Sequence, residues 1–337
     1  MSTPVSTPPV LPDDCCSFWR TDLARARQLV SARWLQRQLA GQVVTVAPAP
    51  HWRLFEVVEG GSAAPCGKRI PGAHWLDVQA LEQAPLWNKV ADAQLLRVLQ
   101  SHGVRHDTTV VLAGRQLVAN ARVAHLLLYV GVRDVRLLDG GTPAWVAAGL
   151  PLTDAPAPLP APTPDFGPHL PACPHLLIDT AQVHQLLAQA HATLVSVRTW
   201  SEYSGKSSGY DYITPRGEIV GARWGHAGAD GDVNDMSAFH TPAGLMKPAS
   251  EILQLWRSQH VHPGRPVAFY CGTGWRASLA FFYAWLMGWD DISVYDGGWL
   301  EWSSDPRNPI INRQQLREHG AESIAARTQQ SLRHAAA

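Results

Sequence analysis

Short apolar runs alternate with longer amphipathic segments along the chain, and the pattern is clearest in its second half. The runs at 194–197, 266–270 and 292–295 have the length and composition of buried strands. Helical periodicity instead marks the segments 181–190 and 277–287. Strands that alternate with helices assemble into a parallel sheet covered by helices. The pattern therefore predicts an α/β fold.

A similar pattern occurs in the first half, which indicates an internal repeat. The motif Asp-Gly-Gly at 139–141 recurs at 296–298, an offset of 157 residues. Each copy follows an apolar run, and a tryptophan stands four residues after each copy, Trp145 in the first half and Trp302 in the second. We expect two homologous domains in tandem, each a parallel sheet flanked by helices.

Composition shifts along the chain suggest where these domains begin and end. The segment 151–174 is crowded with proline and alanine, which is typical of a stiff, extended linker. It separates a first domain at 28–150 from a second domain at 175–310. Residues 1–27 begin with a Pro-, Ser- and Thr-rich stretch and are expected to form a disordered leader, because they lack the basic start and apolar run of a secretory signal. Residues 311–337 are expected to form a polar C-terminal tail.

The overall charge narrows the range of partners. Lys+Arg and Asp+Glu are equal at 28 each, without a dense basic run, so neither nucleic acid nor an anionic membrane surface is an expected partner. The longest apolar stretch, 119–132, is interrupted by Arg122 and His125 and is too short to span a bilayer. The composition is that of a soluble globular protein.

Cysteine and histidine usage gives no sign of a structural metal or a disulfide framework. The five cysteines are an odd number without regular spacing, and the 15 histidines show no pattern that would gather ligands on one helical face. We expect no metal and no cofactor. A reducing cytoplasm is the simplest compartment for such a chain.

One cysteine stands in a chemically distinctive place. Cys271 follows the predicted strand 266–270 directly and precedes a turn, punctuated by Gly272 and Gly274, that enters a helix. Backbone N–H groups in such a turn can point inward as an anion-binding nest, and the helix start adds partial positive charge. Arg276 adds a fixed positive charge. A buried cysteine more often behaves as a small hydrophobe, but this surrounding pattern is rare and indicates a reactive thiolate.

The length of the loop discriminates between two chemistries. In cysteine phosphatases an arginine follows the cysteine after five intervening residues, which makes a cradle wide enough for a phosphoryl group. Here four residues separate Cys271 from Arg276, and the next position is Ala277. The smaller loop favours a single sulfur atom over a phosphoryl group.

The loop 271–276, together with 296–299, resembles the rhodanese family, and the segments 201–206, 221–226 and 302–306 extend the likeness. The resemblance implies two rhodanese-like domains and a double displacement. The Cys271 thiolate would attack the outer sulfur of thiosulfate and release sulfite, leaving a cysteine persulfide. Cyanide, a thiol or an acceptor protein would then take the sulfur.

The resemblance also assigns roles to residues around Cys271. The persulfide would be stabilised by the N–H groups of the loop residues Gly272, Thr273, Gly274, Trp275 and Arg276. In the first domain the offset of 157 residues puts Gly114 at the cysteine position, so this domain should be catalytically silent and cover the site. In tandem rhodaneses the catalytic pocket lies between the domains, which makes His74, Trp75 and Trp87 candidate lining residues.

Departures from the family pattern leave the donor open. Arg198 ends a strand where the family usually has Asp-x-Arg, and Ser196 replaces the acid. Glu202 occupies the position where related thiosulfate and mercaptopyruvate enzymes tend to have an anion-holding arginine; Arg276 or Arg223 could compensate. We treat Arg198 and Arg223 as supporting residues. 3-Mercaptopyruvate as donor, or a persulfide carrier that delivers sulfur to a partner, are the alternatives to a thiosulfate sulfurtransferase.

Overall fold

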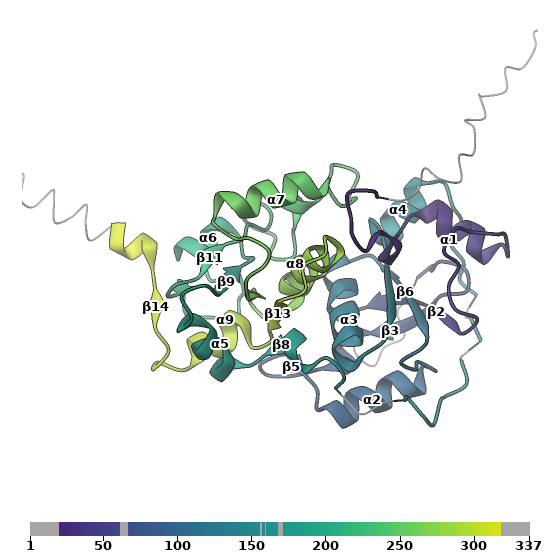
Figure 1. Ribbon diagram of the computed structural model, residues 1–337, viewed down its shortest axis with the longest axis horizontal. Helices are drawn as coiled ribbons and strands as arrows, with labels where there is room; N and C mark the ends of the chain where they lie inside the picture. The colour runs from purple at the N-terminus through teal and green to yellow at the C-terminus, as the bar shows by residue number, and fades with distance from the viewer. Residues whose placement is uncertain (1–19, 61–66, 156, 159, 168–170, 318–337) are drawn as a thin grey trace, which may run out of the picture.

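The computed structural model describes residues 20–60, 67–155, 157–158, 160–167 and 171–317. They form two α/β units that lie side by side, one on each side of a central pair of helices (Figure 1). Most of the predicted leader and most of the predicted tail lie outside the described residues. No helix in the described part of the chain has the length and apolar character needed to cross a membrane.

The sheet of the first unit has five parallel strands within the described residues, in the order β1-β7-β6-β2-β3. Its strands are β1 (Leu29–Val30), β2 (Trp52–Val58), β3 (His74–Asp77), β6 (Thr109–Gly114) and β7 (Asp134–Leu138). The sheet of the second unit is also five-stranded and parallel over the same part of the chain, in the order β8-β13-β12-β9-β11. Its strands are β8 (Leu177–Ile178), β9 (Thr193–Ser196), β11 (Arg223–Trp224), β12 (Val267–Tyr270) and β13 (Ile292–Tyr295). The two orders correspond strand for strand, which confirms the repeat and the predicted fold class.

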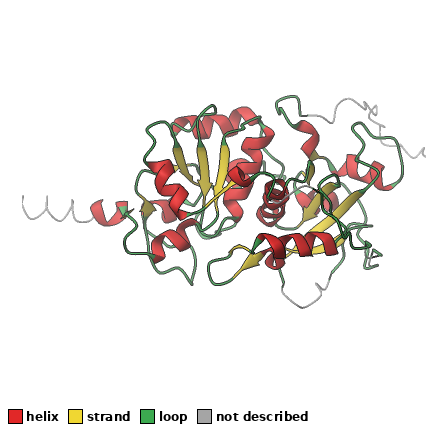
Figure 2. Ribbon diagram, turned by 60° about the horizontal axis from the view of Figure 1, so that its bottom comes forward, coloured by secondary structure: helices red, strands yellow, loops and turns green. Residues whose placement is uncertain are grey.

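Helices lie on either side of each sheet (Figure 2). In the first unit they are α1 (Ala32–Leu39), α2 (Asp92–Ser101), α3 (Leu117–Val130) and α4 (Gly141–Ala147). In the second they are α5 (Thr180–Leu187), α6 (Trp200–Ser204), α7 (Ala249–Ser258), α8 (Trp275–Leu286) and α9 (Gly298–Ser304). Two short antiparallel pairs complete the strands, β4 (Glu82–Gln83) with β5 (Asn88–Lys89) and β10 (Glu218–Ile219) with β14 (Ile310–Ile311).

Local sequence explains the helix boundaries. A capping box between Asp179 and Gln182 starts α5. Gly274, in the left-handed region at φ 102°, precedes α8, which therefore begins two residues earlier than the apolar periodicity alone predicted.

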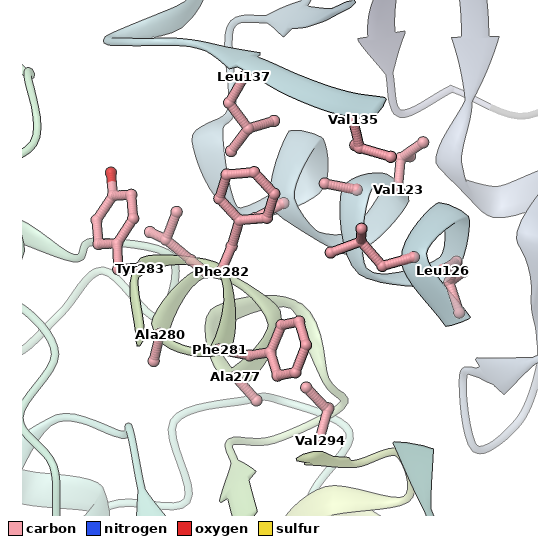
Figure 3. Close-up of a cluster of buried hydrophobic side chains, with 14 of the residues drawn as sticks. Val123, Leu126, Val135, Leu137, Ala277, Ala280, Phe281, Phe282, Tyr283 and Val294 are labelled. Atoms are coloured by element: carbon pink, nitrogen blue, oxygen red, sulfur yellow. The ribbon is translucent and has the colours of Figure 1, made fainter. Parts of the chain in front are cut away.

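The two units pack through α3 and α8, the helices that follow the equivalent strands β6 and β12. Every residue of α3 from Val118 to Val130 is buried, as is typical of a helix that is apolar on all sides. Figure 3 shows Val123 and Leu126 on α3 facing the side chains of Phe281 and Phe282 on α8. The interface is therefore a continuous hydrophobic core rather than a contact between two finished surfaces.

The aspartates of the repeated Asp-Gly-Gly motif each reach across this interface. Asp139 of the first unit accepts the backbone N–H of Met246 at 2.8 Å. Asp296 of the second unit accepts the backbone N–H of Lys89 at 2.9 Å and the Arg122 guanidinium at 2.6 Å. The repeat thus places equivalent carboxylates where each fixes the opposite domain.

The described part of the proline-rich segment runs along the first unit. Thr153 pairs with Arg69, Thr163 donates its N–H to the carbonyl of Gln100, and the buried Phe166 accepts the N–H of His106. These bonds anchor an extended chain that contains few backbone donors of its own.

We predict that the protein loses stability as the pH is lowered from 7 to 4, because of His125, a fully buried residue of α3. Its Nε2 bonds to the Leu176 carbonyl at 2.8 Å and its ring lies edge-on to Phe281. Burial, aided by the charge of Arg122, lowers the pKa of His125 to about 4. Between the unfolded pKa of about 6.5 and pH 4 only the unfolded chain takes up the proton, so the folded state should lose about 3 kcal/mol.

The measurement is the free energy of unfolding by urea between pH 7.5 and pH 4. His125→Gln keeps a donor to Leu176 and removes the titration, so its pH dependence should be shallower by about 3 kcal/mol. His191→Gln, at an exposed position, is the matched control. Identical pH profiles for wild type and His125→Gln would contradict the assignment.

Candidate active site

Cys271 lies at the carboxyl end of β12 and is 1% exposed. Its Sγ accepts the backbone N–H of Gly274 at 3.2 Å, so the loop folds back over the sulfur before α8 begins. A sulfur anion held by a backbone donor at a helix start is electrostatically stabilised. The structure therefore forms the glycine turn that the sequence predicted around this thiol.

The residues that follow the second Asp-Gly-Gly motif hydrogen-bond to the backbone of the Cys271 loop. The backbone N–H groups of Trp299 and Leu300 donate to the carbonyls of Cys271 and Gly272 at 2.8 and 3.1 Å. Gly298 has φ 55°, and a Cβ there would lie 2.6 Å from the Gly272 oxygen. The glycine is required because the two backbones approach each other too closely for a side chain.

Arg276 is completely buried, and its two Nη atoms donate to the Glu202 carboxylate at 2.8 Å each. Nη2 also donates to the Tyr210 hydroxyl at 3.1 Å. Burial opposes the charged form of Glu202, but the Arg276 charge and its hydrogen bonds lower the pKa of Glu202 to about 2. We expected Arg276 to place a fixed positive charge near the thiol, and in the structure its guanidinium pairs with the Glu202 carboxylate.

The two supporting arginines do not reach the sulfur. Arg198 is buried, donates to Glu218 at 3.1 Å and to the Gly217 carbonyl, and lies over the Trp299 ring, so it braces the second domain. Arg223 starts β11 and lines an exposed cavity beside Arg265, at the amino-terminal edge of the sheet. Since Cys271 stands at the carboxyl edge, Arg223 is at the wrong end of the sheet to assist it.

A cavity of about 290 Å³ opens beside the loop, between the two units. The first unit contributes Glu59, Gln79, Glu82 and Trp87, and the second contributes Tyr210, Tyr212, Val233, Asn234, Thr273 and Trp275. Of the three residues predicted to line an interdomain pocket, Trp87 does so. Trp75 instead stacks on Arg69 and lines a separate cavity, and His74 lies in β3 against Phe55.

The two tyrosines were not predicted from the sequence. The Tyr210 ring covers Gly272, where a Cβ would lie 2.2 Å from it. Burial raises the pKa of Tyr210 and of Tyr212, and both rings line the cavity beside the loop. Tyr212 hydrogen-bonds with Thr273. Both residues come from an irregular loop, where no periodic pattern marks them.

Two buried charged residues of the first domain, Glu82 and Arg122, lie next to the Cys271 loop. Glu82 accepts the Trp275 indole N–H at 2.9 and 3.0 Å and the Arg122 Nε at 2.8 Å. Burial raises the pKa of Glu82, against the lowering effect of Arg122. Because Arg122 also binds Asp296, the loop, the motif and the first domain are joined by one ion network.

The equivalent loop of the first domain is shorter and more tightly packed than the loop at Cys271. Only Arg115 and Gln116 separate the end of β6 from α3, against four residues between β12 and α8. Gly114 has φ 149°, and a Cβ there would lie 2.4 Å from the Asn120 side chain and 2.6 Å from the Val57 carbonyl. A side chain at position 114 would therefore meet Asn120 and Val57.

Comparisons with known proteins agree with this arrangement. A family model described as "Rhodanese-like domain" matches residues 31–148 and 179–305. The thiosulfate sulfurtransferase YnjE of Escherichia coli (strain K12) is 50% identical over 288 residues, which are 86% of this chain and 66% of YnjE. The crystal structure of YnjE matches with a TM-score of 0.82, over 86% of this chain and 69% of that one. This chain thus spans about two thirds of the length of YnjE.

Two further relatives carry different names. A probable 3-mercaptopyruvate sulfurtransferase of Pseudomonas aeruginosa is 35% identical, over 72% of this chain and 83% of the relative. The structure of an anaerobic ergothioneine biosynthesis enzyme from Chlorobium limicola, in complex with trimethyl histidine, is 34% identical, with a TM-score of 0.81 over 86% of this chain and 71% of that one. Family match, identity and the repeated fold together show that this chain belongs to the rhodanese family.

Proposed function

We propose that this chain is a thiosulfate sulfurtransferase that carries a sulfane sulfur as a persulfide on Cys271. The observation that carries the proposal is the loop: a buried cysteine at a strand end, whose sulfur accepts a backbone N–H within a four-residue turn at the start of a helix. Such a site stabilises a sulfur anion without a charged side chain.

The reaction is a double displacement. The Cys271 thiolate attacks the outer sulfur of thiosulfate, the sulfur–sulfur bond of thiosulfate breaks, and sulfite leaves with the bonding electron pair. The nucleophilic acceptor, cyanide or a thiol, then attacks the terminal sulfur of the persulfide, and the electron pair of that bond returns to Cys271. Backbone donors aimed at the sulfur are suited to both steps because they need no reorganisation as charge moves.

The loop residues share this task in different ways. Gly272 and Gly274 allow the turn, and Thr273 presents its hydroxyl beside Tyr212. Trp275 and Arg276 anchor the turn to buried carboxylates of the two domains, as their hydrogen bonds to Glu82 and Glu202 imply. Under this proposal the side chains hold the loop and the backbone binds the sulfur.

Two alternatives use the same cysteine. With 3-mercaptopyruvate as donor, the site would need a cation for the carboxylate, and Arg276 is occupied by Glu202. A persulfide carrier would receive and deliver sulfur by contact with a partner protein, and would show slow turnover with small molecules. We propose the reducing cytoplasm as the compartment, since the chemistry requires a free thiol.

The first prediction of this proposal concerns Cys271→Ser. Wild-type protein incubated with thiosulfate alone should gain the mass of one sulfur atom, and with cyanide it should produce thiocyanate over many turnovers. Cys271→Ser should do neither, because an alcohol forms no persulfide. A stable persulfide without turnover would favour the carrier alternative, and no reaction at all would require a different donor.

A second prediction tests the silent domain. Gly114→Cys in the Cys271→Ser background should not restore persulfide formation, because the new side chain meets Asn120 and Val57 and the loop is too short. We expect it to lower stability by about 1–3 kcal/mol, measured by urea unfolding against Cys271→Ser alone. Sulfur gain by the double variant would show that the first domain has kept a competent cradle.

A further inference from the structure

A second cavity, of about 480 Å³, lies at the amino-terminal edge of the second sheet, at the opposite end of the strands from Cys271. It is formed where three neighbouring strands begin: Arg223 opens β11, Thr193 opens β9, and Arg265 stands two residues before β12. The remaining lining residues belong to the segments that lead into these strands, namely Ala190, His191, Ala192, Gly221, His260 and His262. The reaction proposed for Cys271 uses none of them.

The charged groups around this cavity have one sign. Two arginines and three histidines line it, and no aspartate or glutamate of the described chain does. Neither Arg223 nor Arg265 forms an ion pair with a described residue, whereas the buried arginines of the same domain, Arg198 and Arg276, each bind a carboxylate. The guanidinium groups of Arg223 and Arg265 therefore keep their charge available to a ligand.

Two helix ends also face this edge of the sheet, and cations near a helix C-terminus are favourable in themselves. The helices α5 and α7 end at Leu187 and Ser258, shortly before the cavity residues begin. Each C-terminus carries roughly half a negative charge, so the two ends supply about one negative charge against the two permanent charges of Arg223 and Arg265. The cavity is therefore net positive before any histidine is protonated.

His260 occupies a position where the backbone favours glycine. It follows the end of α7 with φ 59°, and the next N–H, that of Val261, donates back to the Trp256 carbonyl at 3.0 Å. This is the left-handed turn that commonly ends a helix, and glycine is the residue that makes it most easily. The sequence thus places an imidazole at the cavity at some cost to the local backbone.

We propose that this cavity binds a compact oxyanion with two negative charges, of the phosphate or sulfate type. Guanidinium groups match such ions because their N–H donors lie in one plane and bind two oxygens at once. Imidazoles supply further N–H donors. The described lining contains no phenylalanine, tyrosine or tryptophan, which favours a polar ion over an apolar ligand. The proposal does not depend on the persulfide chemistry, because Cys271 lies at the other edge of the sheet.

The test is a calorimetric titration of the full chain carrying Cys271→Ser, which removes the nucleophile of the reactive loop. Inorganic phosphate and sulfate are the two probes, and sodium chloride holds the ionic strength constant. Each ion should fill one saturable site per chain, with half-saturation at about 1 mM or below, and each should displace the other.

Variants show whether the cavity holds the ion. Arg223→Gln and Arg265→Gln should each weaken binding about tenfold, since each removes a charged donor. His260→Gly should weaken it several-fold while keeping the left-handed turn that ends α7. Arg97→Gln, at an exposed position on α2, removes the same charge outside the cavity and should leave the affinity unchanged. Unfolding of each variant by urea checks that the fold is intact.

Two results would overturn the proposal. One is the absence of saturable binding by either ion at constant ionic strength. The other is an affinity that stays the same in Arg223→Gln, Arg265→Gln and the parent chain, which would put the ion at the reactive loop or elsewhere. Thiocyanate production by the chain that keeps Cys271 is a separate measurement, so either result leaves the sulfurtransferase proposal standing.

Discussion

The buried guanidinium of Arg122 joins the two domains and the reactive loop in one contact. It binds Glu82, which holds the Trp275 indole, and Asp296, whose motif supports the loop carbonyls. Removing one partner of a buried ion network leaves an uncompensated charge and typically costs about 3–5 kcal/mol. The orientation of the domains and the shape of the loop are therefore fixed together, so the cavity between the domains has a defined wall.

The repeat explains how the first domain, which has Gly114 at the position equivalent to Cys271, is joined to the second. Both domains keep the Asp-Gly-Gly motif, and each aspartate bonds to the opposite domain, Asp139 to Met246 and Asp296 to Lys89. Both also keep the central helix, and α3 and α8 share one core (Figure 3). The turn after β6 differs from the turn after β12: it has two residues instead of four, and the Asn120 side chain lies against Gly114.

Because Arg276 pairs with Glu202, its side chain holds the loop in place, while the backbone of the loop contacts the sulfur. An arginine that ends in a buried bidentate pair orients a helix and a loop but has little attraction left for a ligand. The Cys271 sulfur accepts a backbone N–H from Gly274, and such a hydrogen bond strengthens when the sulfur carries negative charge. Aromatic rings and carboxylates form much of the wall of the cavity beside the loop.

The sequence by itself determined those features of the protein that depend on residues close together in the chain. Strand lengths, the repeat, the glycine turn and the four-residue spacing from Cys271 to Arg276 follow from such features, and the structure contains them. Only the tertiary structure decided which charges are free. Arg276 meets Glu202 and Arg122 meets Asp296 across 74 and 174 residues, and Arg223 lies at the far edge of the sheet. The cavity also brings together Trp87 of the first domain and Tyr210 and Tyr212 from one loop of the second, and such contacts arise only when the two domains pack together.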